Sequence, residues 1–410
     1  MRRWLLGAAL VAGLAVPTLA QADQQSDQIA HGMYVTRAAD CQACHTAPGG
    51  QAFAGGRAFV LPFGVLYSPN ITPDPLTGIA GYSDDDWVRM IQQGIGRGGK
   101  RLYPAMPYPS YTGMSRDDAL AIKTYLMSLP PVQAQVPPNQ IKFPFNQRWG
   151  MVFWNIVNNS NQRFQPDPAQ SAAYNRGAYL VEDLGHCGEC HTPRNFMMGL
   201  SSRKFAGAAQ EGWLAYNLTS DKTSGIGGWG DAALTQYLST GFAPGHGPAS
   251  GPMAEAVQDS LQYLTPQDIG DIVLYLRKVP ARPDGPAAVD GNGAPLVTAD
   301  ALGPRLFAQA CEGCHLTNGG GRQWAWAALK GSQTAGDPAG LNIVQVLSQG
   351  SQIETAQGTM FMHPFTGAYT ADELAALANY TISQFGYRQG NVTAQQFRDA
   401  SQPTAGKPSS

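Results

Sequence analysis

The sequence predicts a mainly α-helical protein in which three copies of one small domain follow one another, joined by loop-rich connections. Three observations predict this: a Cys-x-x-Cys-His unit occurs three times, residues around the units repeat at a fixed offset, and a helix with one start signal follows each unit. The 410 residues include 48 glycines and 30 prolines without a collagen-like period, so we expect compact domains rich in loops.

Residues 1–22 have the composition of a secretory signal peptide. Arg2 and Arg3 precede an apolar run from Trp4 to Val16, and Ala20-Gln21-Ala22 supplies small residues for cleavage. The run is shorter than the roughly 20 residues that cross a bilayer. We therefore expect cleavage after Ala22, with Ala20 as the alternative, and an exported mature protein.

All six cysteines belong to the three Cys-x-x-Cys-His units. Their pairs are Cys41 and Cys44, Cys187 and Cys190, and Cys311 and Cys314. Two thiols on one helical turn form thioethers with the two vinyl groups of one haem, and the following histidine then reaches the iron. These histidines are His45, His191 and His315. A zinc site would need further ligands at suitable spacing, and a redox disulfide needs no histidine, so we predict three covalently bound haem c groups.

An internal repeat supports three copies independently of the cysteines. Adding 147 to a position after the first unit leads to the same residue type after the second. The matched pairs are Asn70 and Asn217, Thr72 and Thr219, Asp74 and Asp221, Gly78 and Gly225, and Ile79 and Ile226. The first two copies are therefore duplicates of one domain.

The same register indicates methionine as the second axial ligand of each iron. Met106 lies 61 residues after His45, and Met253 lies 62 residues after His191. Two candidates follow the third unit, Met360 and Met362. A spacing of 12 residues separates Gly94 from Met106, Gly241 from Met253, and Gly350 from Met362. We therefore predict Met362, with Met360 as the alternative.

Other side chains remain conceivable ligands. His363 follows Met362 directly and would give bis-histidine ligation, and His31, His186 and His246 are further candidates. We interpret these three as surface residues or as neighbours of the ligands.

A helix with a common start signal closes each domain. Ser115, Thr265 and Thr370 are N-cap residues, each followed three positions later by an acid, and only Thr370 with Glu373 completes a capping box. The apolar stripe of each closing helix is expected to pack on the helix before each haem unit. Gly32, Gly177 and Gly303 would allow those helices to approach closely.

These signals divide the chain into seven parts. We assign residues 1–22 to the signal peptide, 23–131 to domain one, 132–168 to an aromatic and proline-rich connection, 169–281 to domain two, 282–297 to a linker, 298–389 to domain three and 390–410 to a polar tail. The connection is too aromatic for a free linker, so we expect it to pack against the domains rather than to form a docking face. We expect the tail to be disordered.

The sequence closely resembles the tri-haem cytochrome c subunits of bacterial membrane-associated dehydrogenases that oxidise alcohols, gluconate, fructose, sorbitol or aldehydes. Beyond the haem units, the resemblance rests on four segments: Ser68–Asp74, Met106-Pro107-Tyr108, Phe143-Pro144-Phe145-Asn146 with Arg148, and Cys187–Pro193. The third copy departs from the usual Met-Pro pattern, with Met362-His363-Pro364-Phe365.

The resemblance implies a subunit that takes electrons from a separate flavin- or quinone-cofactor dehydrogenase and passes them to ubiquinone or a terminal oxidase. It also implies a periplasmic location at the outer face of the cytoplasmic membrane, with peripheral membrane association.

The residues themselves point to electron transfer. A haem with both His and Met bound has no vacant position for a substrate, and the sequence shows no catalytic constellation, so we assign no catalytic residue. The net charge of −2 leaves no basic stripe to neutralise phosphates, which excludes a nucleic-acid partner. Two alternatives stay open: a peroxidase-like haem enzyme with one open haem, and a donor subunit of a terminal oxidase.

Overall fold

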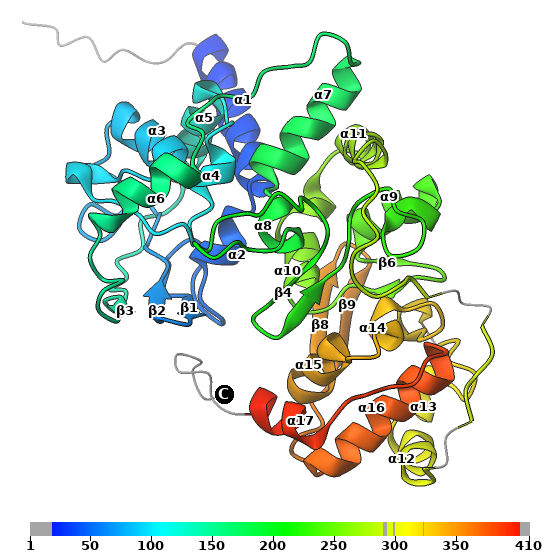
Figure 1. The fold of residues 1–410 in the computed structure, drawn as a ribbon. Coiled ribbons are helices and arrows are strands. Elements are labelled where there is room, and N and C mark those ends of the chain that lie inside the picture. The colour runs from blue at the N-terminus through cyan, green and yellow to red at the C-terminus, as the bar shows by residue number, and fades with distance from the viewer. Residues whose placement is uncertain (1–18, 290–292, 298–299, 323, 402–410) are drawn as a thin grey trace, which may run out of the picture.

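The computed structural model describes residues 19–289, 293–297, 300–322 and 324–401 (Figure 1). The first 18 residues of the expected signal peptide and residues 402–410 of the expected tail lie outside this range. The chain is largely helical, with four small antiparallel sheets in the described part. No helix within the described residues is both long enough and apolar enough to cross a bilayer.

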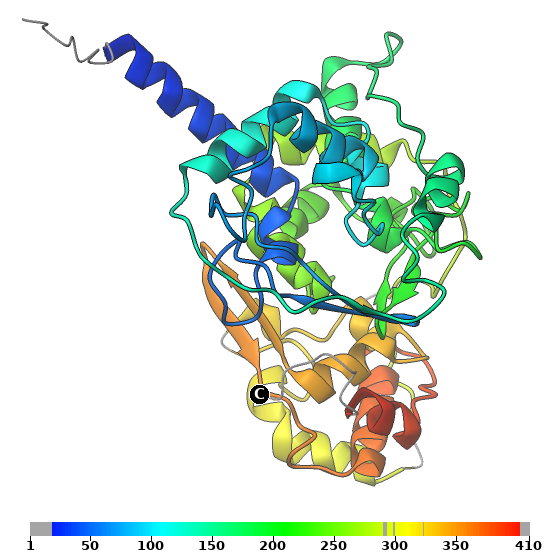
Figure 2. The ribbon, with the colours of Figure 1, turned by 90° about the vertical axis from the view of Figure 1, so that its left-hand side faces the viewer.

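The first unit begins with a long helix whose N-terminal part projects from the body of the molecule (Figure 2). Its elements are α1 (Leu19–Ala38), α2 (Cys41–His45), β1 (Ala58–Leu61), β2 (Gly64–Tyr67), α3 (Asp84–Gln93), η1 (Arg97–Gly99), α4 (Tyr108–Tyr111) and α5 (Arg116–Ser128). The connection then adds β3 (Gln140–Ile141), which pairs with β2 to make a three-stranded sheet, and α6 (Gly150–Asn158).

The second unit repeats this order with a π-helical turn inserted before its haem motif. Its elements are α7 (Ala172–Tyr179), η2 (Leu180–Leu184), α8 (Gly188–His191), β4 (Ala208–Gln210), β5 (Trp213–Ala215), η3 (Ile226–Gly228), α9 (Asp231–Thr240), β6 (Phe242–Ala243), β7 (Gly247–Pro248), α10 (Pro252–Asp259), η4 (Leu261–Tyr263) and α11 (Pro266–Arg277).

The third unit carries a β-hairpin before its closing helix, where the first unit has η1 and α4 and the second has β6, β7, α10 and η4. Its elements are α12 (Leu302–Ala310), α13 (Glu312–His315), η5 (Ala325–Ala327), α14 (Gln333–Gly336), α15 (Leu341–Gln349), β8 (Ser351–Thr355), β9 (Gly358–Met362), α16 (Ala371–Phe385) and α17 (Ala394–Ser401). The hairpin reaches the second unit, where Gln258 accepts a hydrogen bond from the Glu354 amide at 2.9 Å.

Each unit is organised by one helix pair, as the sequence predicts: α1 packs on α5, α7 on α11, and α12 on α16. A glycine stands at each crossing. A Cβ at Gly32 would lie 2.1 Å from the Ala121 carbonyl oxygen, one at Gly177 1.9 Å from that of Asp271, and one at Gly303 2.6 Å from that of Ala376. These distances are too short for any side chain, so glycine is required for the observed helix separation.

The predicted helix starts are also confirmed. The side chains of Ser115, Thr265 and Thr370 accept hydrogen bonds from the amides three residues later, at 3.0, 3.1 and 3.3 Å. The Glu373 carboxylate in turn accepts a hydrogen bond from the Thr370 amide at 2.9 Å, which completes the single capping box expected.

The first two units share one hydrophobic core. Val35, Trp87 and Ile122 of the first unit belong to the same buried cluster as Val181 and Ile272 of the second. The third unit has a separate core, built around Leu306, Phe307, Leu347, Ile382 and Phe385. The first and second units are therefore fused, and the third is attached to them.

A reciprocal pair of tyrosines joins the fused units. The Tyr34 hydroxyl donates to Asp268, at the start of the second unit's closing helix, at 2.5 Å. The Tyr179 hydroxyl donates to Asp118, at the corresponding position of the first unit, at 2.7 Å. Each hydroxyl also accepts a hydrogen bond from the N-cap amide of that helix, Thr265 or Ser115. Each unit thus completes the helix start of the other. The third unit has Arg305 two residues after its glycine and no such tyrosine.

One expectation from the sequence is confirmed in part and another is wrong. The connection packs on both units, through β3 on β2 and through the Trp154 indole on the Met197 carbonyl, but Phe143, Trp149, Phe153 and Ile156 are 61–78% exposed. The tail was expected to be disordered from residue 390, but α17 packs on α15 and α16 with Phe397 fully buried. One buried aromatic residue in a polar sequence is a weak sequence signal, yet it is enough to hold a short helix on an existing core.

Adding a methyl group at a helix crossing should weaken the fold, whereas adding one on an open helix face should not. We expect Gly177→Ala to lower the free energy of unfolding by about 1–3 kcal/mol, because the new Cβ meets the Asp271 carbonyl. Gly270→Ala lies on the partner helix α11 with nothing within 4 Å, and should raise that free energy by up to about 1 kcal/mol. Denaturant unfolding of both variants checks the pair, and equal effects would contradict the packing argument.

The buried Asp183 should make stability depend on pH. Burial, reinforced by the negative charge of Glu182, raises the pKa of Asp183 from 3.8 to about 7. Folding then favours the protonated carboxyl, so its contribution is complete below pH about 4 and is lost as the pH rises through about 7, at roughly 1.4 kcal/mol per pH unit at most. We expect Asp183→Asn to stabilise the protein more at pH 8 than at pH 5 in denaturant titrations. Parallel pH profiles of the two proteins would refute this.

Candidate haem sites

Each Cys-x-x-Cys-His unit lies on one short helical turn, as its spacing predicts. The first forms α2, and the second and third place Cys187 and Cys311 at the N-caps of α8 and α13. All six thiols are free. Among the described residues, no group of three or more His, Cys, Asp and Glu side chains is arranged to hold a metal ion, so these thiols have no additional zinc ligands.

Each of the three histidines in these motifs forms the same kind of hydrogen bond, from Nδ1 to a backbone carbonyl. Nδ1 of His45 lies 2.8 Å from the Pro69 carbonyl oxygen, Nδ1 of His191 2.5 Å from that of Tyr216, and Nδ1 of His315 2.7 Å from that of Ala327. A carbonyl only accepts, so Nδ1 carries the proton and Nε2 keeps its lone pair. Burial lowers the pKa of all three histidines, which favours the neutral, metal-binding form.

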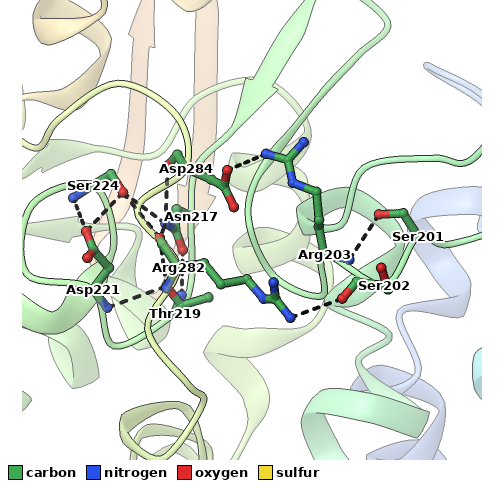
Figure 3. Close-up of polar contacts among 9 residues, drawn as sticks. All are labelled: Ser201, Ser202, Arg203, Asn217, Thr219, Asp221, Ser224, Arg282 and Asp284. Atoms are coloured by element: carbon green, nitrogen blue, oxygen red, sulfur yellow. Dashed lines mark hydrogen bonds and ion pairs between the residues drawn. The ribbon is translucent and has the colours of Figure 1, made fainter.

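The 147-residue repeat is explained by the loops that carry these carbonyl groups. Asn70 and Asn217 follow Pro69 and Tyr216 directly. The side-chain oxygen of each asparagine accepts a hydrogen bond from the backbone amide two residues later, at 2.9 and 2.8 Å. Their amide groups donate to the segment after the closing helix, to Val132 at 2.7 Å and to Arg282 at 2.6 Å. Figure 3 shows the second copy, where Asp221 also accepts from Ser224 and Arg203 pairs with Asp284.

The predicted methionines follow three helix ends that carry a glycine, which is left-handed at Gly94 and Gly241 but has a ψ of −173° at Gly350. Gly94, Gly241 and Gly350 end α3, α9 and α15 with φ of 64°, 78° and 77°, and each amide donates back to the last helical turn. These positive φ values favour glycine. Met106 and Met253 are half-buried against the shared core of the first two units.

In the third unit, the two candidate methionines pack against different hydrophobic clusters. Met362 packs against the core of its own unit, to which Cys311 also belongs. Met360 packs instead on a small cluster with Ala249, Val257 and Ile353, most of which comes from the second unit. Each unit therefore combines two thiols, a neutral imidazole and a half-buried thioether, and this donor set fits haem c.

The remaining histidines have other neighbours. His31 lies 3.2 Å from Asp118, the ring of His186 meets Tyr111 edge-on at 5.4 Å, and His246 stacks on Trp229 at 3.6 Å. His363 is exposed beside Phe361.

The first and second sites are adjacent through residues that the sequence did not single out. The Tyr111 hydroxyl donates to the Ala39 carbonyl, two residues before Cys41, while its ring meets His186, next to Cys187. Arg57 donates to Ala43, inside the first motif, at 2.6 Å. It also pairs at 2.8 Å with Glu255 on α10, the helix that carries Met253. Tyr111 and Arg57 belong to no sequence motif, so their contacts between the two sites are visible only in the structure.

The second and third sites meet through a stacked aromatic pair. Phe242, at the start of the segment that leads to Met253, stacks on Trp326 with ring centroids 5.5 Å apart. Trp326 precedes Ala327, whose carbonyl holds His315. On the other side, the Asn342 amide of the third unit donates at 3.2 Å to the hydroxyl of Tyr216, whose carbonyl holds His191. The three sites are thus consecutive neighbours.

Comparisons with known proteins agree with this geometry. A family model described as Cytochrome c matches residues 29–130, and one described as Cytochrome C oxidase, cbb3-type, subunit III matches residues 298–380.

Several relatives are similar along most of the chain. The cytochrome subunit of fructose dehydrogenase from Gluconobacter japonicus is 36% identical over 92% of this chain and 83% of its own length. The gluconate 2-dehydrogenase cytochrome c subunit of Pantoea cypripedii is 34% identical, over 94% and 92%. The cytochrome c subunit of alcohol dehydrogenase (quinone) from Gluconacetobacter polyoxogenes is 32% identical, over 97% and 89%. The chain therefore belongs to the family of cytochrome c subunits of dehydrogenase complexes.

Proposed function

We propose that this chain carries three haem c groups and relays electrons one at a time from a dehydrogenase of the alcohol, sugar or aldehyde class to ubiquinone or a terminal oxidase. It does so in the periplasm, at the outer face of the cytoplasmic membrane, after residues 1–22 have been removed. The observation that carries the proposal is the threefold recurrence of a Cys-x-x-Cys-His turn whose histidine Nδ1 is held by a backbone carbonyl.

The role of each side chain follows from its position. Cys41 and Cys44, Cys187 and Cys190, and Cys311 and Cys314 would form the thioethers. Nε2 of His45, His191 or His315 and the sulfur of Met106, Met253 or Met362 would hold the iron. The haem, when bound, supplies reversible one-electron chemistry. With both of these ligands supplied by the protein, the iron would have no position for a substrate, so the oxidised substrate would bind to the partner subunit.

The contacts between sites support a relay. The site rearranges little on electron transfer when its ligands are held rigidly. Each histidine here is fixed by a backbone carbonyl, in a loop that is itself hydrogen-bonded. Tyr111 packs between the first and second motifs, and Phe242 with Trp326 between the second and third. The electrons have a packed protein path between neighbouring sites without crossing open solvent.

A redox titration with haem quantification tests the proposal. We expect three haems per chain, all low-spin, and co-purification with a dehydrogenase subunit. Fewer than three haems would refute the count. A high-spin haem with peroxidase turnover would favour the haem-enzyme alternative, for which the third site is the candidate because Met362 lies on a hairpin strand, whereas Met106 lies in a bend and Met253 in helix α10.

The two candidate ligands of the third haem should respond differently to truncation. We expect Met362→Ala to convert one of three haems to the high-spin state, because its iron loses the sixth ligand. Met360→Ala should leave all three low-spin, since this side chain packs toward the second unit. Low-temperature magnetic spectra distinguish the states, and the reverse pattern would assign Met360 as the ligand.

A further inference from the structure

Helix α6 exposes its apolar side and turns polar side chains toward the protein, the opposite of an ordinary surface helix. Large apolar side chains spaced at i, i+4, i+7 and i+8 point outward with 61–74% of their surface exposed: Trp149, Phe153, Ile156 and Val157. Its asparagines face the protein instead. Asn155 accepts from the Tyr108 hydroxyl at 2.6 Å and donates to the Gln93 carbonyl at 3.2 Å. Exposing such an apolar face to water is energetically unfavourable, and covering it lowers the free energy of the protein.

The apolar surface continues onto a neighbouring loop. The indole of Trp154, on the inner side of α6, donates to the Met197 carbonyl at 2.8 Å, which holds the loop against the helix. In that loop Phe196 is 95% exposed and Met198 is 46% exposed. We call Trp149, Phe153, Ile156, Val157, Phe196 and Met198 the α6 face.

The chain segments that carry and adjoin the α6 face have exposed cations and no acid of their own. No Asp or Glu occurs in residues 87–116, 119–166 or 190–210, although the whole chain has a net charge of −2. Lys142 precedes the helix, and Arg97 and Lys100 lie on a segment tied to it by the Arg148 bond to the Arg101 carbonyl, at 2.5 Å. These three cations are exposed, whereas Glu189, which pairs with Arg194 in the loop, is buried. Projecting apolar residues flanked by exposed cations match an anionic lipid surface.

We propose that the α6 face rests on an anionic phospholipid bilayer, with its side chains in the interfacial region and Lys100 and Lys142 against the headgroups. The inference deepens the proposed function, on which it rests, by naming the surface that contacts the membrane. A protein partner would need a matching hollow for each projecting side chain, whereas lipid adapts to all of them, and tryptophan and phenylalanine are favoured at that depth.

The consequence for the relay follows from the inner side of α6. Tyr108, which bonds to Asn155, stands two residues after Met106. A bilayer under the α6 face therefore lies beside the methionine side of the first haem site.

Vesicle flotation of the haem-loaded protein that begins after Ala22 tests the proposal. We expect binding to vesicles that contain phosphatidylglycerol and weaker binding to pure phosphatidylcholine. Phe153→Ser combined with Ile156→Ser should lower the partition coefficient at least about tenfold, since each side chain loses its apolar burial. Lys100→Glu combined with Lys142→Glu should lower it by about fivefold per site or more, on anionic vesicles only.

Matched controls lie elsewhere on the surface. Leu76→Ser replaces an apolar residue that is 78% exposed, and Lys330→Glu reverses an exposed charge in the third unit; neither should change binding. Haem content and thermal unfolding of each variant verify that it is folded. These readouts also test the proposed function separately, because a haem count can fail while vesicle binding persists.

Unchanged vesicle binding by the Phe153/Ile156 and Lys100/Lys142 variants would overturn the proposal. If those variants also failed to co-purify with the dehydrogenase subunit, the α6 face would be a protein-docking surface instead.

Discussion

The arrangement of this protein depends on the exchange of Tyr34 and Tyr179 between its first two units. Each hydroxyl binds a carboxylate and an amide at the first turn of the other unit's closing helix. Burial alone would raise the pKa of Asp268, but hydrogen bonds from Arg176 and Tyr34 bring it below its ordinary value, so the carboxylate stays charged and accepts strongly. Because both tyrosines lie on the helices that lead into the haem motifs, the exchange also sets how those motifs face each other.

That constraint explains why the first two sites differ from the third. In the fused pair, the motif turns approach closely enough for one residue, Tyr111, to contact the backbone before the first and the ring before the second. The third unit instead attaches through its own hairpin and through side chains that imitate strand pairing, as Asn342 does with Leu214 at 2.7 and 3.0 Å. Its haem environment can therefore vary without disturbing the fused core, which agrees with its separate hydrophobic cluster and its altered methionine segment.

Local chemistry made much of this fold predictable. The N-cap hydrogen bonds of Ser115, Thr265 and Thr370 reach only three residues along the chain. The Cys-x-x-Cys-His turns and the bonds of the Asn70 and Asn217 side chains to the amides two residues on also depend on short spacings, so these features can be recognised in the sequence. Contacts between distant segments are different. The Tyr34–Asp268 bond spans 234 residues, and the tyrosine alone reads as a packing residue. Nor does apolar spacing say which side of a helix faces inward, so the aromatic residues of the connection do not by themselves show that α6 exposes its apolar side.

The fused core also bears on how the chain would mature under the proposed export. Residues would cross the membrane in order, so the helix carrying Tyr34 would emerge long before α11 and its Asp268. The core around Val35 cannot close until residues near Ile272 have arrived. Under the same proposal, Cys41 and Cys44 would sit on an unfinished domain through most of translocation, open to the enzymes that attach haem. The late arrival of the second closing helix would leave such an enzyme time to reach both motifs before folding covers them.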